Sequence, residues 1–326
     1  MESWKGMLYL FGAFTLAGSS VITGSLLNGK LGAFTITAIS LLLALMILVP
    51  MRLQELVRSL GRRAGTNWSQ LLLQAVFGMF LFRMFMLFGL SHTSAAEAGI
   101  LTGATPAVTV VLARLVLKER VNRFSLLGIA GTVSGIILIQ GLFSQGSSFT
   151  VQHLIGNMLV LCAAASESVF NILSRMSSPK NDGRSQQPVD PVVQTTLVSA
   201  IAFLLCLIPA GFEHPLRSLA GIGWEEWVAL IWYGPFVTAL AFVLWYAGIH
   251  RCDASTAAAF SGMMPFTALI LSVVLLGQQA GVEQWSGGLL VAAGMVLIGL
   301  NQTRTGGERK IGKSGLNLNR AKRTQH

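Results

Sequence analysis

The chain has 326 residues, of which 53% are hydrophobic and only 11% are charged, and its mean hydropathy is +0.65. An ordinary soluble domain carries about 25% charged residues, so this composition excludes a water-soluble globular fold. The net charge of +10 does not indicate nucleic-acid binding, because the basic residues lie between apolar runs or near the end of the chain and form no aromatic-interleaved face. Lipid is therefore the predicted solvent.

Apolar runs of about 20 residues follow one another along the chain, each long enough to cross roughly 30 Å of hydrocarbon as a helix. Strands of a membrane barrel would be about half as long and alternate in polarity. The sequence therefore predicts an all-α, polytopic membrane protein with ten transmembrane helices. In chain order the predicted spans are 7–28, 32–51, 70–90, 94–117, 122–143, 154–174, 192–212, 224–249, 254–276 and 282–301.

The connections between these runs are short and mostly polar, and the longest are 51–67 and 177–190. No soluble catalytic domain is expected between the spans.

The distribution of Lys and Arg predicts the orientation, because basic residues are enriched in cytoplasmic loops. With both termini in the cytoplasm of a plasma or inner membrane, only Lys30 and Arg217 lie outside. Nineteen basic residues then lie inside: Lys5, Arg52, Arg58, Arg62, Arg63, Lys118, Arg120, Arg123, Arg175, Lys180, Arg184, Arg251, Arg304, Arg309, Lys310, Lys313, Arg320, Lys322 and Arg323.

An internal repeat is visible when the stretch that starts at Ser94 is aligned with the stretch that starts at Asp253, at a constant spacing of 159 residues. The register continues without a gap through two spans and their connection. Each half contains five crossings, an odd number, so the halves must be inverted with respect to one another. The predicted units are 7–143, 152–301 and a basic, disordered cytoplasmic tail at 302–326. The matched pairs include Gly89 with Gly248, Ala95 with Ala254, Pro106 with Pro265, Gly128 with Gly287 and Gly135 with Gly294.

The phrase LSHTSAAEAGILTGATPAVTVVLARLVLKERVN (90–122) resembles a characteristic stretch of the EamA family in the drug/metabolite transporter superfamily. The ten spans and two tandem halves extend the resemblance over about 7–301. The resemblance implies an exporter or exchanger of amino acids, nucleosides, other metabolites or drugs, with a substrate cavity between the halves. One departure is Gly277-Gln278-Gln279, which replaces Lys118-Glu119-Arg120 in the second copy and agrees with an outer position for that loop.

Glu167 is the sharpest candidate for a functional residue, because it lies deep in the sixth span and a charge buried in lipid is costly. Asn171 follows it at i+4 and shares its helix face. A carboxylate at that depth can bind substrate or carry a proton. A protonated glutamate that only bonds across a helix interface is the alternative.

Arg83 lies among Met and Phe residues in the third span and offers a rigid donor fork for a carboxylate or phosphate. The competing interpretation is an ion pair with Glu97, which lies at a similar depth on the next span. Glu97 also has a structural explanation, because Ser94 and Glu97 have the spacing of a capping box.

Pro106 and Pro265 are predicted helix breaks that serve gating, although plain helix-shaping prolines explain them equally well. Trp245 and Tyr246 are the aromatic candidates for stacking on a ring or a cation, with Phe82 and Phe85 nearby. Aromatic residues that face lipid or a neighbouring helix are the competing interpretation.

The chain lacks a GxxxxGK[ST] loop, a His/Asp/Ser constellation and a metal-ligand spacing within the spans, so ATP-driven transport, an enzyme, a cofactor and a metal site are not expected. The predicted function is secondary transport of small metabolites, amino acids or drugs by alternating access. Proton coupling is a hypothesis based on Glu167, and a homodimer is left open. The alternative is a non-transporting helix bundle that organises lipid or a protein partner, which predicts a tightly packed centre without a polar cavity.

Overall fold

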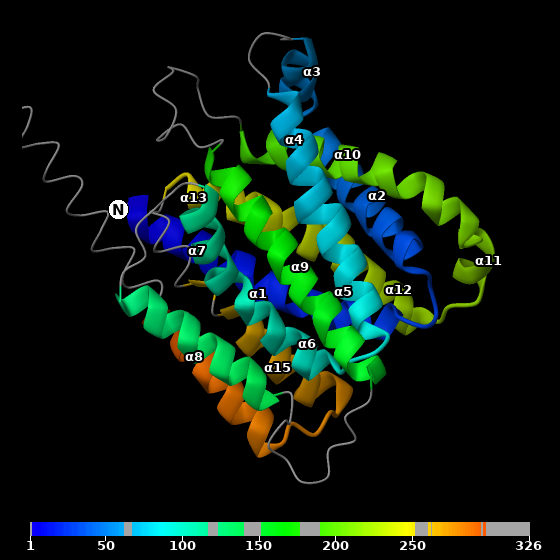
Figure 1. Ribbon diagram of the computed structural model, residues 1–326. Helices are drawn as coiled ribbons and strands as arrows, with labels where there is room; N and C mark the ends of the chain where they lie inside the picture. The colour runs from blue at the N-terminus through cyan, green and yellow to red at the C-terminus, as the bar shows by residue number, and fades with distance from the viewer. Residues whose placement is uncertain are drawn as a thin grey trace, which may run out of the picture.

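The computed structural model describes residues 2–61, 67–116, 123–139, 151–176, 190–251, 260–261, 263–294 and 296–297. These residues form helices and short connections, and none of them belongs to a β-strand. Figure 1 labels the elements. They are α1 Glu2–Leu27, α2 Ala33–Met51, α3 Leu53–Gly61, α4 Trp68–Ala75, η1 Val76–Leu81, α5 Phe82–Leu90, α6 Ala95–Leu101, η2 Thr102–Ala104, α7 Thr105–Val116, α8 Arg123–Ile139, α9 Val151–Met176, α10 Pro191–Phe212, α11 Pro215–Ala220, α12 Trp224–Ile231, η3 Trp232–Leu240, α13 Ala241–Ile249 and α15 Met263–Leu276.

Seven helical segments in the described residues are long and apolar enough to cross a membrane. They correspond to predicted spans one to four and six to eight. The fifth and ninth predicted spans are shorter helices, α8 and α15, and the tenth contains a helical stretch at 282–294. Residues 140–150, 252–259 and 298–326, which include the predicted cytoplasmic tail, lie outside the described residues. The multi-pass, all-helical prediction is confirmed, and the count of ten stays a prediction.

Large apolar side chains cover the outside of the bundle as well as its core. Met46, Leu204, Ile208 and Val274 are exposed on long helices, whereas Leu10, Ile36 and Leu41 are fully buried. In water such a surface would aggregate, but against lipid tails it is the expected outer face of a membrane protein. Trp68, Trp224, Trp227 and Trp285 are exposed at or near helix starts, as expected for aromatic residues at the membrane interface.

The longest helices pack across the sequence midpoint. In the first part of the chain α1 packs mainly against α13 and α15, and in the second part α9 packs mainly against α5 and α7. The pair α2 and α10 also joins the two parts (Figure 1). The first helix of each predicted half therefore lies against the third and fourth spans of the other half.

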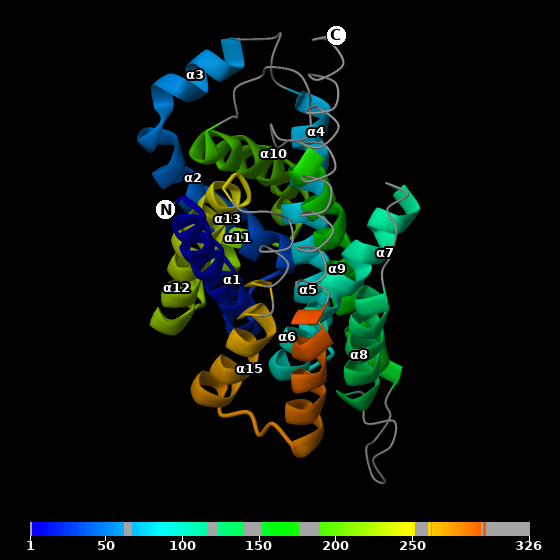
Figure 2. The ribbon, with the colours of Figure 1, turned by 90° about the vertical axis from the view of Figure 1, so that its left-hand side faces the viewer.

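Glycines at repeat-related positions make matching close contacts. A Cβ on Gly135 would lie 2.6 Å from the carbonyl oxygen of Gly287, and a Cβ on Gly294 would lie 2.5 Å from that of Gly128. Gly287 lies 159 residues after Gly128, and Gly294 lies 159 residues after Gly135. The contact of Gly135 with Gly287 is therefore the repeat-related counterpart of the contact of Gly294 with Gly128. Figure 2 shows α8 beside the helix of residues 282–294 where these backbones meet.

A second reciprocal contact involves Gly89 of α5 and Gly248 of α13. A Cβ on Gly89 would lie 3.0 Å from the carbonyl oxygen of Gly156 in α9, and a Cβ on Gly248 would lie 3.4 Å from that of Gly6 in α1. Small residues of this kind let membrane helices approach closely. Gly89 and Gly248 have the 159-residue spacing of the sequence repeat, and each contacts the first helix of the other predicted half.

Two spans contain π-helical stretches at equivalent places. The segment η1 interrupts the third span and η3 interrupts the eighth, and residues 76–81 plus 159 give 235–240, which lie within η3. A π-helical stretch is rare and occurs often at functional sites. The sequence analysis predicted continuous helices here, because no simple residue pattern marks a π-helix.

The predicted break at Pro106 coincides with a change in helix type. The 3₁₀ segment η2 ends one residue before α7, and Pro106 is the second residue of α7. Proline is favoured in this first turn, where its missing N–H is not needed. Pro265 is the third residue of α15. A gating role for either proline stays a prediction.

The predicted connection 51–67 contains the helix α3. Its apolar residues Leu53 and Val57 are exposed, and Leu56 packs against the core. Figures 1 and 2 both show α3 projecting from one end of the bundle.

Candidate functional site

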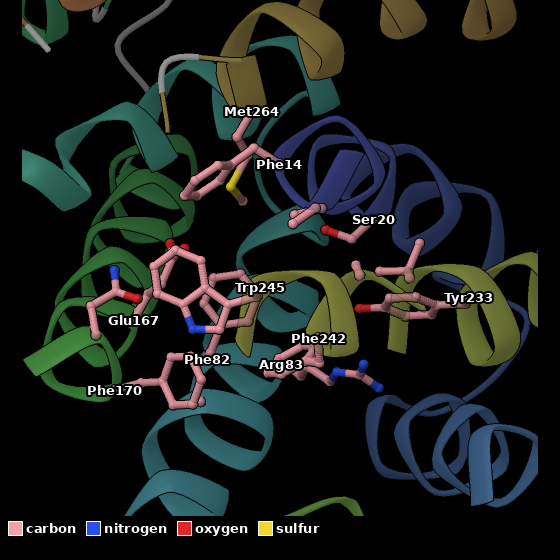
Figure 3. Close-up of a pocket in the computed structure, with 16 residues that line it drawn as sticks. Phe14, Ser20, Phe82, Arg83, Glu167, Phe170, Tyr233, Phe242, Trp245 and Met264 are labelled. Atoms are coloured by element: carbon pink, nitrogen blue, oxygen red, sulfur yellow. The ribbon is translucent and has the colours of Figure 1, made fainter. Parts of the chain in front are cut away.

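A cavity lies where α1, η1, α5, α9, η3, α13 and α15 meet. Its space between protein atoms is about 650 Å³, counting the part that opens outward. Figure 3 shows its lining. The residues are Ala13, Phe14, Ala17, Ser20, Gly78, Phe82, Arg83, Glu167, Phe170, Asn171, Tyr233, Val237, Ala241, Phe242, Trp245 and Met264.

The cavity wall uses equivalent positions from both sequence repeats. Gly78, Phe82 and Arg83 line it from η1 and α5, and the residues 159 positions later, Val237, Ala241 and Phe242, line it from η3 and α13. The two π-helical stretches therefore contribute Gly78 and Val237 to the wall and lie directly before its other residues, Phe82, Arg83, Ala241 and Phe242. Arg83 is matched by Phe242, so the positive charge occurs on one side only.

Glu167 lines the cavity from α9, and its partner lies at the break in the fourth span. The hydroxyl of Thr105 donates to Glu167 Oε2 at 2.8 Å. The neighbouring Ser168 hydroxyl donates to the carbonyl oxygen of Thr105 at 2.9 Å. The carboxylate of Glu167 is thus attached to the first residue of α7, next to Pro106. Asn171 lines the same cavity one helical turn away.

Arg83 is 2% exposed and is held by hydroxyl groups instead of a carboxylate. Nη1 donates to Ser40 Oγ at 2.8 Å, Nη2 donates to Thr238 Oγ1 at 2.5 Å, and the guanidinium lies 4.7 Å from the centre of the Tyr233 ring. Within the described part of the chain, no acidic side chain forms an ion pair with Arg83. The alternative of an Arg83–Glu97 ion pair is therefore wrong for this structure.

The side chain of Glu97 contacts polar groups of α9. Its Oε2 lies 3.1 Å from His153 Nε2 of α9 and accepts from Thr93 Oγ1 at 3.2 Å and from Asn157 Nδ2 at 3.5 Å. One half of the predicted capping box is confirmed, because Ser94 Oγ accepts from the Glu97 N–H at 3.2 Å. The Glu97 side chain instead joins α6 to α9, and this carboxylate does not line the cavity.

The two aromatic candidates, Trp245 and Tyr246, lie in different surroundings. Trp245 lines the cavity, but Tyr246 lies in the packed core beside it, where its hydroxyl donates to Gln74 Oε1 at 2.9 Å. The structure thus brings four predicted site residues to one cavity, namely Glu167, Asn171, Arg83 and Trp245, and leaves Tyr246 outside it.

Sequence reasoning missed several aromatic lining residues, Phe14, Phe170, Tyr233 and Phe242. An aromatic residue in an apolar span has no pattern that separates a cavity wall from a lipid-facing surface. No group of three or more His, Cys, Asp or Glu suited to a metal ion occurs in the described ranges.

The sequence model of the EamA-like transporter family matches residues 4–141 and again 154–300. The chain belongs to the EamA-like transporter family. It is 32% identical over 268 residues to the uncharacterized transporter YetK of Bacillus subtilis, covering 82% of this chain and 78% of that protein.

Other relatives of this EamA-like chain carry more specific names. A probable amino-acid metabolite efflux pump of Salmonella typhimurium is 28% identical, with 62% of this chain and 67% of the relative covered. The aromatic amino acid exporter YddG of Ancylobacter novellus is 26% identical, with 68% and 71% covered. A solved crystal structure matches 92% of this chain and 98% of its own with a TM-score of 0.61 at 20% identity, which supports the fold alone.

Family membership identifies this EamA-like chain as a multi-pass membrane transporter of a small molecule and not an enzyme. The predicted family and function class are confirmed. The non-transporting bundle is not favoured, since it predicted a packed centre without a polar cavity and the structure has a cavity lined by Glu167 and Arg83.

Proposed function

We propose that this chain exports small zwitterionic metabolites, and amino acids with apolar or aromatic side chains in particular, by alternating access. The observation that carries the proposal is a cavity with one carboxylate and one guanidinium between aromatic rings. Glu167 offers an acceptor for an ammonium group, and Arg83 provides a fixed positive charge for a carboxylate. Phe14, Phe82 and Phe170 offer apolar surface for the rest of the solute.

The names of two relatives support the same substrate class. One is called a probable amino-acid metabolite efflux pump and the other an aromatic amino acid exporter. Identity of 26–28% leaves room for a different solute on the same fold, so the chemistry of this cavity is the stronger support.

The architecture that we propose for export has ten spans in two inverted halves, 7–143 and 152–301, with the tail 302–326 and both termini in the cytoplasm of the cell membrane. The family model that matches twice supports the halves. The reciprocal glycine contacts at Gly135 and Gly294 support a two-fold relation between them. Inverted repeats about a central site allow that site to open alternately to either face.

Glu167 is the proposed proton-carrying residue. It lies in a membrane-spanning helix, it lines the cavity, and Thr105 is its hydrogen-bond partner. A carboxylate at this place can exchange a proton for a solute as the cavity changes face. The break in the fourth span at Thr105 lies close enough to respond to that exchange.

The test uses purified protein in proteoliposomes and labelled amino acids, with and without a pH gradient. Wild-type protein is expected to show saturable flux that the gradient drives. Glu167→Gln is expected to lose gradient-driven flux and to retain a weakened solute exchange without a gradient, because the Gln oxygen still accepts from an ammonium group but carries no charge. Glu225→Gln is the matched control, because Glu225 is exposed at the start of α12. Unchanged pH dependence in Glu167→Gln would remove this residue from the mechanism.

A further inference from the structure

The indole N–H of Trp245 is an unused hydrogen-bond donor in the cavity wall. Trp245 is 8% exposed, and Nε1 finds no acceptor among the described residues. A buried donor without an acceptor destabilises the folded state, so most buried polar groups are paired and an exception needs an explanation. The ring lines the same cavity as Glu167 and Asn171, and neither side chain accepts this bond.

A second tryptophan on the same span shows that the fold can pair such a group. Trp232 Nε1 donates to Ser19 Oγ at 2.9 Å, and Trp232 does not line the cavity. Of these two tryptophans, the one that lines the cavity is the one whose buried indole N–H has no acceptor among the described residues.

Packing alone does not require an N–H at this place. Met86 is 159 residues before Trp245, is 1% exposed and fills the equivalent position with an apolar side chain. Phe14 contacts the Trp245 ring edge to face, with 5.4 Å between ring centres and 75° between planes. Met264 and Ile249 belong to the same buried cluster. The indole is therefore held in one orientation, and its donor is fixed before any ligand binds.

We propose that Trp245 is a specificity-determining residue whose indole N–H donates to an oxygen acceptor, a carboxylate or carbonyl oxygen, of the transported solute. This inference rests on the proposed function and adds to it a required acceptor atom on the substrate. Figure 3 shows the Trp245 ring among the side chains that line the cavity, together with Glu167 and Arg83. A solute bound in this cavity therefore meets the Trp245 donor as well as the two charged groups, and its carboxylate can accept from Trp245 in addition to the charge that Arg83 provides.

A donor of this kind acts mainly by weakening the binding of solutes that lack an acceptor. A solute without an acceptor leaves the N–H unpaired, and a site built around a hydrogen bond discriminates strongly against analogues that cannot form it. One bond to a carboxylate contributes about 1.5–3 kcal/mol, which corresponds to a preference of roughly tenfold or more. The aromatic walls interact equally with both solutes, so they contribute little to this preference.

The experiment compares labelled L-phenylalanine with labelled 2-phenylethylamine, which keeps the ring and the ammonium group and lacks the carboxylate. Counterflow of each probe is measured in proteoliposomes for wild type and for Trp245→Phe, which removes only the N–H-bearing part of the ring. The expected result is a preference for L-phenylalanine that falls about tenfold in the variant. Trp232→Phe is the matched control and is expected to keep the wild-type preference.

A second variant protects the test from a folding defect. Replacement of Trp245 by 3-benzothienylalanine puts sulfur in the place of the N–H and preserves the shape of the ring. If this variant keeps the wild-type preference, the proposal is overturned. Wild-type counterflow of L-phenylalanine tests the proposed function, and the change in preference tests Trp245, so the two can fail separately.

Discussion

The residue with the least ordinary environment is Arg83, a buried cation bonded to two hydroxyl groups. Ser40 Oγ also donates to the carbonyl oxygen of Thr37 at 2.9 Å, and Thr238 Oγ1 donates to that of Tyr233 at 2.8 Å. Both hydroxyls therefore keep a hydrogen bond when Arg83 is absent. A buried charge without a counter-ion destabilises a folded protein. The burial of Arg83 is therefore better explained by a role in function than by a contribution to stability.

Arg83→Met separates the two roles. We expect the variant to fold with a melting temperature at or above that of wild type, because a desolvated charge is removed and no hydroxyl loses its only bond. Transport of L-phenylalanine is expected to fall at least about tenfold, since charge-assisted bonds contribute roughly 1.5–3 kcal/mol. Thermal unfolding in detergent and proteoliposome counterflow measure the two effects.

The control for Arg83→Met is Arg217→Met, at an exposed position of α11. A variant of Arg83 that unfolds would show a structural role. One that folds and transports normally would exclude contact between Arg83 and the solute.

Helices were easier to predict than the breaks within them. The ends of α2, α10 and the span 224–249 lie within one residue of the predicted limits, because apolar run length determines a span. The rule that a charge in a span deserves attention also led to Glu167 and Arg83. The π-helical stretches η1 and η3 and the contacts of Thr105 and Thr238 were not predicted. Hydroxyl groups are common in apolar helices, and only the three-dimensional packing decides which of them meets a charge.

The crossing of α8 with the helix of residues 282–294 depends on glycine. A Cβ on Gly135 or Gly294 would press on backbone of the other helix at 2.6 or 2.5 Å, and backbone cannot move aside as a flexible side chain can. We expect Gly135→Ala and Gly294→Ala each to destabilise the protein by about 1–3 kcal/mol, the usual cost of overpacking. Thermal unfolding in detergent measures this loss.

Gly211 of α10 is the matched control, because a Cβ there would meet nothing within 4 Å. Gly211→Ala is expected to be neutral or to stabilise by up to about 1 kcal/mol through helix propensity. Equal effects at all three positions would mean that the close helix crossing contributes nothing to stability.

At the scale of the whole molecule, the proposed orientation places the two charged cavity residues at different depths. Arg83 is seven residues before the end of α5, roughly 10 Å from the proposed outer surface. Glu167 lies seven residues before Ser174, where the sixth span ends, at a similar distance from the proposed inner surface. A solute that leaves the cell would thus pass Glu167 before it reaches Arg83.

That order depends on the topology, which single cysteines can test. In a background with Cys162, Cys206 and Cys252 changed to Ala, Leu216→Cys in α11 and Val57→Cys in α3 introduce thiols at residues that are 83% and 61% exposed. A membrane-impermeant maleimide added to intact cells is expected to label position 216 and to leave position 57 unlabelled until the cells are opened. Neither substitution changes a basic residue, so the charge distribution that determines the orientation is preserved. The reverse labelling would show that the protein has the opposite orientation in the membrane. Arg83 would then be nearer the cytoplasm than Glu167, and an exported solute would meet the fixed positive charge before the proton-carrying carboxylate.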